Sequence, residues 1–227
     1  MNRAAFYSEI RAHVFDGSLT QRQVAGIEAL LAATDSMHLT HRAYLLATAY
    51  HETAATMQPI IEYGGRKYFD KYDTGKLAAA LGNTPASDGD GYLYRGRGYV
   101  QITGRANYGK AGMALGVDLV KQPDLALQPT VAANIIVRGC SEGWFTGKSL
   151  SDYLPGDYVG ARRVVNGTDK AGLIADYARA FEKALAIAGS KDMPNPVGDN
   201  IAAKTDTKPG FLAGIIAAIV ALFGKGK

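Results

Sequence analysis

The stretch THRAYLLATAYHE, residues 40–52, decides the fold class. As a helix, it would carry apolar side chains on all sides of its axis. A helix that is apolar all round is usually buried, so we expect this one at the centre of a core. It must end before Pro59, because proline breaks a helix interior. Its last turn carries a carboxylate, Glu52, so a charged group is expected at the end of a buried helix.

Helical patterns continue on both sides of this stretch. Thr20 and Gln23 form a capping-box pattern that predicts the start of a helix. Apolar residues recur at helical spacing in four further segments, residues 6–14, 24–31, 105–115 and 173–185. The pattern changes between residues 70 and 104, where a turn signal precedes a tyrosine-rich stretch that alternates like a short hairpin. We predict a mainly helical domain over residues 1–189 with a small hairpin or loop region.

Composition and charge exclude several classes of protein. With 47% hydrophobic and 20% charged residues in 227, the chain is neither disordered by composition nor fibrous. The single cysteine, Cys140, excludes an intramolecular disulfide framework and a thiolate zinc cage. A net charge of +4 mildly favours polyanionic partners but does not by itself indicate nucleic acid.

The two ends of the chain differ from the domain. The first 15 residues carry charges within their apolar pattern and no small-residue cleavage site, so we expect synthesis in the cytoplasm. Residues 190–209 contain three prolines and few large apolar groups, which predicts a linker. Residues 210–227 are a lysine-flanked hydrophobic segment, which as a helix of 13 apolar residues would reach only about 20 Å. That is short of a bilayer core of roughly 30 Å, so we expect either contact with an anionic membrane or a core helix docked on the domain.

Two glutamates, Glu52 and Glu62, flank the end of the predicted central helix and are ten residues apart. Glycoside hydrolysis requires such a pair. One carboxyl group gives its proton to the leaving oxygen, and the other, ionised, acts on the anomeric side. The spacing alone favours a surface pair without a catalytic task over a catalytic pair.

Metal sites have weaker support. The zinc-protease pattern needs a second histidine four residues after His51, where Ala55 stands. Asp88 and Asp90 with two glycines resemble a calcium loop, but Tyr99 occupies the twelfth position, where a bidentate glutamate belongs. We therefore expect neither a metal nor a cofactor.

The stretch YRGRGYVQITG, residues 94–104, has the highest density of function-capable groups. Its glycines allow close backbone approach, its tyrosines offer flat faces for sugar rings, and Gln101 and Thr103 offer hydrogen bonds. An arginine–glycine patch for nucleic acid is the alternative, but the motif occurs only once and in an ordered pattern. We favour a sugar-binding segment and expect no nucleic-acid partner.

Taken together, these motifs resemble the catalytic core of glycoside hydrolase family 19, the plant-chitinase type, in the form found in bacteriophage endolysins. The resemblance covers roughly residues 4–189 and is carried, in order, by AYHET, Glu62, YRGRGYVQITGRANYGKAG, GVDLVKQPDLA and RRVVNGT. It implies a two-lobed, lysozyme-like helical fold with the cleft between the lobes. It also implies an inverting mechanism without a metal.

The resemblance assigns roles to individual residues. Glu52 matches the general acid, Glu62 the base that positions water, and Thr103 a residue that helps to hold this water. The substrate-binding residues that we predict are His51, Arg97, Tyr99, Gln101, Asn107, Tyr108 and Asn166. Asp70 and Asp73 are the reserves for the base.

Two departures from the family's pattern bear on function. The family's chitinases often have two glycines after the His-Glu-Thr motif, whereas Ala54 and Ala55 follow it here, and the disulfides of those chitinases are absent. We predict a monomeric phage endolysin that cleaves the β-1,4 bond between N-acetylmuramic acid and N-acetylglucosamine in peptidoglycan. It would be made in the host cytoplasm and act in the periplasm. The alternatives are a chitinase and a membrane-active lytic protein that kills through residues 210–227.

Overall fold

The computed structural model describes residues 1–190, and the fold of this part is mainly helical, as predicted. The helices of four or more residues are α1 (Arg3–His13), α2 (Gln21–Ala33), α3 (Leu39–Glu52), α4 (Arg66–Phe69), α5 (Gly75–Leu81), α6 (Asp90–Leu93), α7 (Arg105–Leu115), α8 (Pro129–Ser141) and α9 (Ala171–Ile187). Short 3-10 helices are η1 (Asp70–Tyr72), η2 (Pro123–Leu127), η3 (Leu150–Asp152) and η4 (Gly160–Val164). The strands are β1 (Ile60–Ile61) and β2 (Arg97–Gly98).

Two compact units make up this fold. Among the described residues, unit 1 contains Met1–Met57 together with residues 137–190, and unit 2 contains Gln58–Ile136. Most of the predicted linker and all of the predicted C-terminal hydrophobic segment lie outside the described residues. Within residues 1–190, no helix combines the length and the apolar character needed to span a bilayer.

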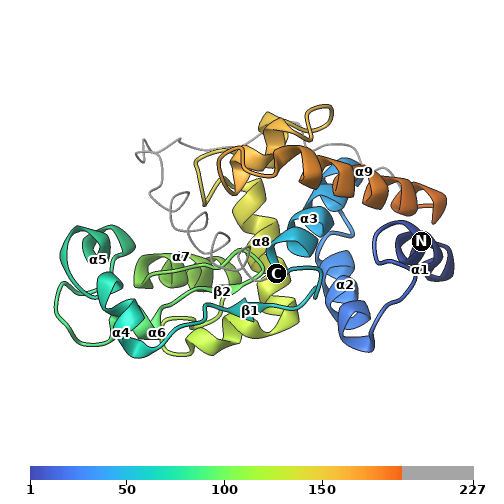
Figure 1. The fold of residues 1–227 in the computed structure, drawn as a ribbon. Helices are drawn as coiled ribbons and strands as arrows, with labels where there is room; N and C mark the ends of the chain where they lie inside the picture. Colours follow the sequence, from blue (N-terminus) through green and yellow to red (C-terminus); the bar gives the residue numbers. More distant parts are fainter. Residues whose placement is uncertain (191–227) are drawn as a thin grey trace. The chain divides into compact units, whose positions relative to one another are not determined.

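In unit 1, α3 is the central helix. Every residue from Thr40 to Ala49 is buried, which confirms the prediction made from the apolar pattern of this stretch. The main neighbour of α3 is α9, which also packs against α1 (Figure 1). The capping box is also confirmed, because the Thr20 hydroxyl accepts from the Gln23 backbone N–H at 3.1 Å and the Gln23 side chain accepts from the Thr20 N–H at 2.8 Å.

Unit 2 is built from short helices around a two-stranded antiparallel sheet. Strand β1 pairs with β2 in the register Ile60 opposite Gly98 and Ile61 opposite Arg97 (Figure 1). After β2 the chain turns back on itself, and Arg97 and Ile102 exchange backbone hydrogen bonds of 3.2 and 3.0 Å. The expected hairpin is therefore replaced by two features. A tight turn is closed between Arg97 and Ile102, and strand β2 at its start pairs with β1, which lies more than 30 residues earlier in the chain. The tyrosine-rich stretch before it begins as the one-turn helix α6, which is too short to show a helical period.

We predict that Leu45→Ala lowers the free energy of unfolding by about 2–5 kcal/mol, because it removes a buried side chain from the centre of α3. The matched control is Leu173→Ala on α9, where the leucine is 43% exposed and the loss should stay below about 1 kcal/mol. Urea unfolding followed by circular dichroism measures both. Equal losses would show that α3 is not the core element that its burial indicates.

Candidate active site

Glu52 ends α3 and is buried against an arginine. Its side chain is 3% exposed, and Oε1 forms an ion pair with Nη1 of Arg162 at 2.5 Å. The Arg162 side chain, on η4, is 1% exposed, and its Nε donates to the Asp169 carbonyl oxygen at 3.1 Å. A buried carboxylate is strongly destabilising without a counter-charge, so Arg162 is the group that makes this position of Glu52 possible.

Arg162 is a residue of this site that the sequence reasoning did not assign. It lies in the quoted motif RRVVNGT next to a second arginine, Arg163, which is exposed. Composition and spacing do not distinguish the two residues. Only the packing of η4 turns Arg162 inward and Arg163 outward.

Three buried polar atoms on or beside the Glu52–Arg162 pair have no hydrogen-bond partner within residues 1–190. They are Nε2 of His51, next to Glu52 in the chain, Nη2 of Arg162 itself, and Nδ2 of Asn166, whose backbone N–H donates to Arg162 O at 2.9 Å. Burial lowers the pKa of His51, so its ring is neutral near neutral pH. An unpaired buried polar group costs about 1–3 kcal/mol, and such groups in a native fold are often paired by a ligand or an ordered water. His51 and Asn166, both predicted to bind substrate, thus offer unused polar atoms.

The backbone that follows Glu52 takes an unusual path. Ala54 and Ala55 have φ of 48° and 64°, and Met57 has φ of 53°. These are left-handed values, which glycine adopts without strain and alanine adopts at a cost of about 1–2 kcal/mol. The two alanines that replace the expected glycine pair therefore keep a glycine-like conformation. The turn is fixed by Thr53, whose hydroxyl donates to Ala49 O at 2.7 Å and accepts from Met57 N at 3.0 Å.

Glu62 lies in unit 2, just after β1, and is held by uncharged donors. Its side chain is buried, with Oε1 accepting from the Tyr72 hydroxyl at 3.1 Å and Oε2 from the Gly96 N–H at 3.0 Å. Its own N–H donates to Gly96 O at 2.8 Å. Burial and the Glu62 carboxylate raise the pKa of Tyr72, so the phenol keeps its proton and can donate. Glu62 is therefore anchored at both carboxylate oxygens.

Gly96 is required where the chain passes Glu62. A Cβ at this position would lie 2.7 Å from Oε1 of Gln101 and 3.2 Å from Oε2 of Glu62. Gln101 is itself fixed by its Nε2, which donates to Ile60 O at 2.7 Å and to Gly98 O at 3.0 Å. Its Oε1 is buried and has no partner within the described chain. Glu62 and Gln101, both predicted site residues, are thus brought together around one glycine.

Thr103 and Asn107 continue this network. The Thr103 side chain is fully buried, and its hydroxyl donates to Gln101 O at 3.0 Å. Asn107 Nδ2 donates to Thr103 O at 2.6 Å. The predicted role of Thr103 in holding water stays a prediction. Its observed contact fixes the peptide of Gln101.

Three other residues predicted to bind substrate are buried inside unit 2, namely Arg97, Tyr99 and Tyr108. Arg97 pairs with Asp124 at 2.8 Å and donates to the Tyr108 hydroxyl at 2.9 Å, while that hydroxyl donates to Arg95 O at 2.7 Å. These contacts hold the 94–104 segment in place. Direct binding of sugar by these side chains stays a prediction.

The reserve carboxylates are placed differently from Glu62. Asp70 is exposed at the start of η1, and Asp73 is buried with Oδ1 accepting from Gly91 N at 2.5 Å. Neither has the pair of donors that Glu62 has. Within residues 1–190, no group of three or more His, Cys, Asp or Glu side chains is placed to hold a metal ion.

Comparison with known proteins identifies the family. The model of glycoside hydrolase family 19, described as chitinase class I, matches residues 22–149, more than half of the chain. The chain belongs to glycoside hydrolase family 19. The matched range of this family 19 chain includes Glu52, Glu62 and the 94–104 segment but ends before Arg162 and Asn166.

Relatives and solved structures agree with this assignment. The family 19 chain is 31% identical over 165 residues to an endochitinase of Arabidopsis thaliana, covering 72% of this chain and 54% of that protein. A basic endochitinase of Vitis vinifera is 46% identical over 55 residues, 24% of this chain and 16% of that protein. The chain thus spans about half, or less, of the length of these relatives. Chitinase C from Streptomyces griseus HUT6037 has the same fold, with a TM-score of 0.54 at 21% identity over 86% of this chain and 78% of that one.

We predict that Arg162→Met lowers the free energy of unfolding by about 3–5 kcal/mol at pH 7, because it leaves the buried Glu52 carboxylate without a counter-charge. Arg163→Met, one residue away and exposed, is the matched control and should cost less than about 0.5 kcal/mol. Adding Glu52→Gln to Arg162→Met should recover much of the loss. Additive effects in this double-mutant cycle, measured by chemical unfolding, would show that the two side chains do not interact.

A second prediction concerns the backbone after Glu52. Ala55→Gly should leave stability unchanged or raise it by up to about 1 kcal/mol, because glycine relieves the left-handed strain and this offsets its greater chain entropy. Ala25→Gly, on the exposed face of α2, should instead cost about 0.5–1 kcal/mol. Thermal unfolding compares the two variants, and the same loss in both would mean that Ala55 is not strained.

Proposed function

We propose that this family 19 glycoside hydrolase is a phage endolysin that cleaves the β-1,4 bond between N-acetylmuramic acid and N-acetylglucosamine in peptidoglycan. The observation that carries the hydrolytic role is the presence of two buried carboxylates with different anchors, Glu52 on Arg162 and Glu62 on Tyr72 and Gly96. Because both carboxylates are buried and hydrogen-bonded to specific donors, they are better explained as acid–base groups than as a solvated pair on the surface.

Charge and cysteine content favour peptidoglycan as the glycan. Its peptide branches carry carboxylates, which a chain of net charge +4 attracts, whereas chitin is uncharged. With a single cysteine, Cys140, this chain has no intramolecular disulfide, which favours a phage or bacterial lytic enzyme over a secreted chitinase of the plant type. The resemblance to the endolysin form of the family adds to these arguments.

Glu52 is the proposed general acid. The reactive form of Glu52 carries the proton, which passes to the glycosidic oxygen as the bond breaks, and the Arg162 guanidinium stabilises the carboxylate that this transfer leaves. Glu62 is the proposed base. Its two neutral donors fix an ionised carboxylate, which takes a proton from water as that water attacks the anomeric carbon, with Thr103 helping to position it.

Glu52→Gln and Glu62→Gln should each lower the rate of hydrolysis by about 10²–10⁴, because each removes a proton-transfer group while keeping the shape of the side chain. The assay is the release of reducing ends from purified peptidoglycan, with thermal unfolding as the check on folding. Glu142→Gln, at an exposed position, should keep full activity. Normal turnover by either folded active-site variant would remove that residue from the mechanism.

Inversion can be tested directly. Proton NMR immediately after cleavage of a β-linked oligomer should show the α-anomer first, because water attacks the face opposite to the leaving group. An initial β-anomer would favour a retaining mechanism.

Chitin hydrolysis is the second candidate function. The relatives named above are endochitinases, and chitin shares the β-1,4-linked N-acetylhexosamine backbone of peptidoglycan. Reducing-end release from the two polymers by the same preparation separates the candidates. We expect faster release from peptidoglycan, and the opposite ranking would assign the chain to chitin.

A further inference from the structure

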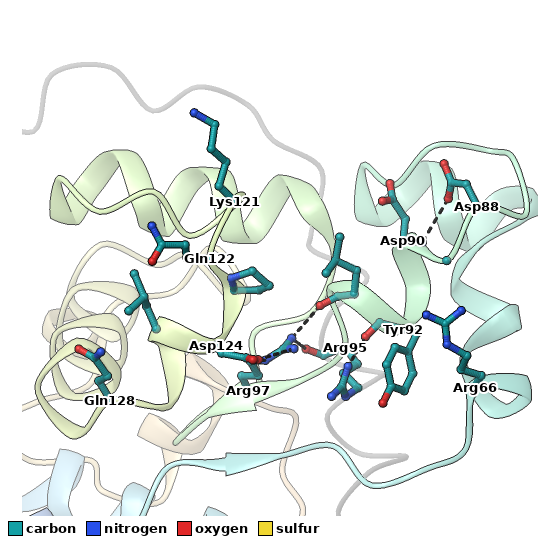
Figure 2. Close-up of a pocket in the computed structure, with 14 residues that line it drawn as sticks. Arg66, Asp88, Asp90, Tyr92, Arg95, Arg97, Lys121, Gln122, Asp124 and Gln128 are labelled. Carbon is teal, nitrogen blue, oxygen red and sulfur yellow. Dashed lines mark hydrogen bonds and ion pairs between the residues drawn. The ribbon is translucent and has the colours of Figure 1, made fainter.

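A highly charged pocket of about 720 Å³ lies wholly within unit 2 (Figure 2). Its volume is in the range of roughly 300–1,000 Å³ that is usual for ligand pockets. The charged side chains that line it are Arg66, Asp88, Asp90, Arg95, Arg97, Lys121 and Asp124. Charged side chains that already form an ion pair within the protein are less available to a ligand, so the unpaired ones decide what this pocket can bind.

Two of the four cations are paired. Arg97 forms its ion pair with Asp124 at 2.8 Å, and Lys121 lies 3.3 Å from Asp118. Arg66 and Arg95 have no carboxylate within 4 Å among residues 1–190. The pocket therefore offers two guanidinium groups that form no ion pair within the described residues.

Both of these guanidinium groups are held against one aromatic ring. The ring of Tyr92 has the Arg95 guanidinium 3.9 Å and the Arg66 guanidinium 5.0 Å from its centre, and Figure 2 shows the ring between them. Arg95 also donates from Nη1 to Tyr92 O at 2.5 Å. Stacking on the ring reduces the freedom of both long side chains, so less conformational entropy is lost when an anion binds.

The acidic side of the same pocket argues against a polyanion. Asp88 accepts hydrogen bonds from the Thr84 hydroxyl and from Asp90 N, and these bonds lower the pKa of Asp88. Asp90 accepts from Thr84 N at 3.1 Å. These two carboxylates would repel a chain of phosphates, but they suit a ligand that carries an amino group as well as carboxylates.

The pocket also borders the anchor of Glu62. Gly96 N donates to Glu62, and Gly96 stands between Arg95 and Arg97, which both line the pocket. A Cβ at Gly96 would point toward Glu62, 3.2 Å from its Oε2, whereas the side chains of Arg95 and Arg97 line the pocket. Glu62 and the pocket are therefore both reached from one short piece of backbone.

We propose that this pocket binds the peptide branch of peptidoglycan, with Arg66 and Arg95 contacting its carboxylates and the Asp88–Asp90 side contacting its amino group. The inference rests on the proposed function, since it specifies which part of the peptidoglycan substrate unit 2 recognises. Guanidinium groups bind carboxylates through paired, charge-assisted hydrogen bonds, which suits them to this task.

The test is isothermal titration calorimetry of the full chain with the synthetic tripeptide L-alanyl-γ-D-glutamyl-meso-diaminopimelate. We expect Arg66→Gln and Arg95→Gln each to weaken binding at least about tenfold, the size expected for loss of a charge-assisted hydrogen bond. Lys76→Gln, at an exposed position on α5 that does not line the pocket, should bind like the wild type. Amidation of the peptide's carboxylates should abolish binding.

Several outcomes would overturn the inference. These are no binding of the tripeptide, equal binding of its amidated form, unchanged affinity in both pocket variants, or tighter binding of inorganic phosphate or a ten-nucleotide DNA strand. Arg66 is exposed, so Arg66→Gln gives an answer even if Arg95→Gln fails to fold. The binding proposal and the proposed function can fail separately. If the tripeptide binds in an Arg66-dependent way but the protein does not hydrolyse peptidoglycan, peptide binding by the pocket is supported and the proposed hydrolytic activity is rejected.

Discussion

The burial of α3 on all sides requires its charged end to be paired within the fold. Glu52 is pushed into the interior by the apolar stretch that precedes it, and Arg162 supplies the opposite charge from a segment 110 residues later in the chain. The candidate acid of unit 1 is thus formed only when residues from both ends of the sequence have packed together. Its position depends on tertiary folding as much as on helix formation.

Glu62 is positioned by a more local arrangement. A two-residue strand, a glycine without space for a side chain and a tyrosine hydroxyl fix both of its oxygens without a cation. The two carboxylates therefore lie in electrostatic environments of different kinds, one beside a guanidinium and one beside neutral donors. Acid and base roles in hydrolases are commonly divided between carboxylates whose surroundings differ in this way.

Sequence reasoning predicted the parts of this arrangement that repeat along the chain or stand together in a motif. The pattern of α3 and the capping box at Thr20 are of this kind, whereas the association of Glu62 with the 94–104 segment came from the family resemblance. Arg162 was not predicted, because an identical residue stands beside it and only packing distinguishes them. The burial of Tyr108 was missed for a similar reason, since a tyrosine can offer its ring either to a sugar or to a core.

The pocket of unit 2 could not be found in the sequence, because it combines side chains from three separate segments. Arg66 belongs to α4, Arg95 precedes β2, and Lys121 lies far along the chain. No spacing rule connects them. By contrast, Tyr92 and Arg95 are three residues apart, and their contact follows from the single turn of α6.

The left-handed alanines after Glu52 bear on how chains of this kind are recognised. A pattern search that demands two glycines after His-Glu-Thr would pass over this chain, although its backbone there has the torsion angles that glycine takes. Alanine at these positions preserves the turn while sacrificing some stability. At this corner of the fold, the residue type and the backbone conformation carry separate information, and only the conformation matches what a glycine pair would give.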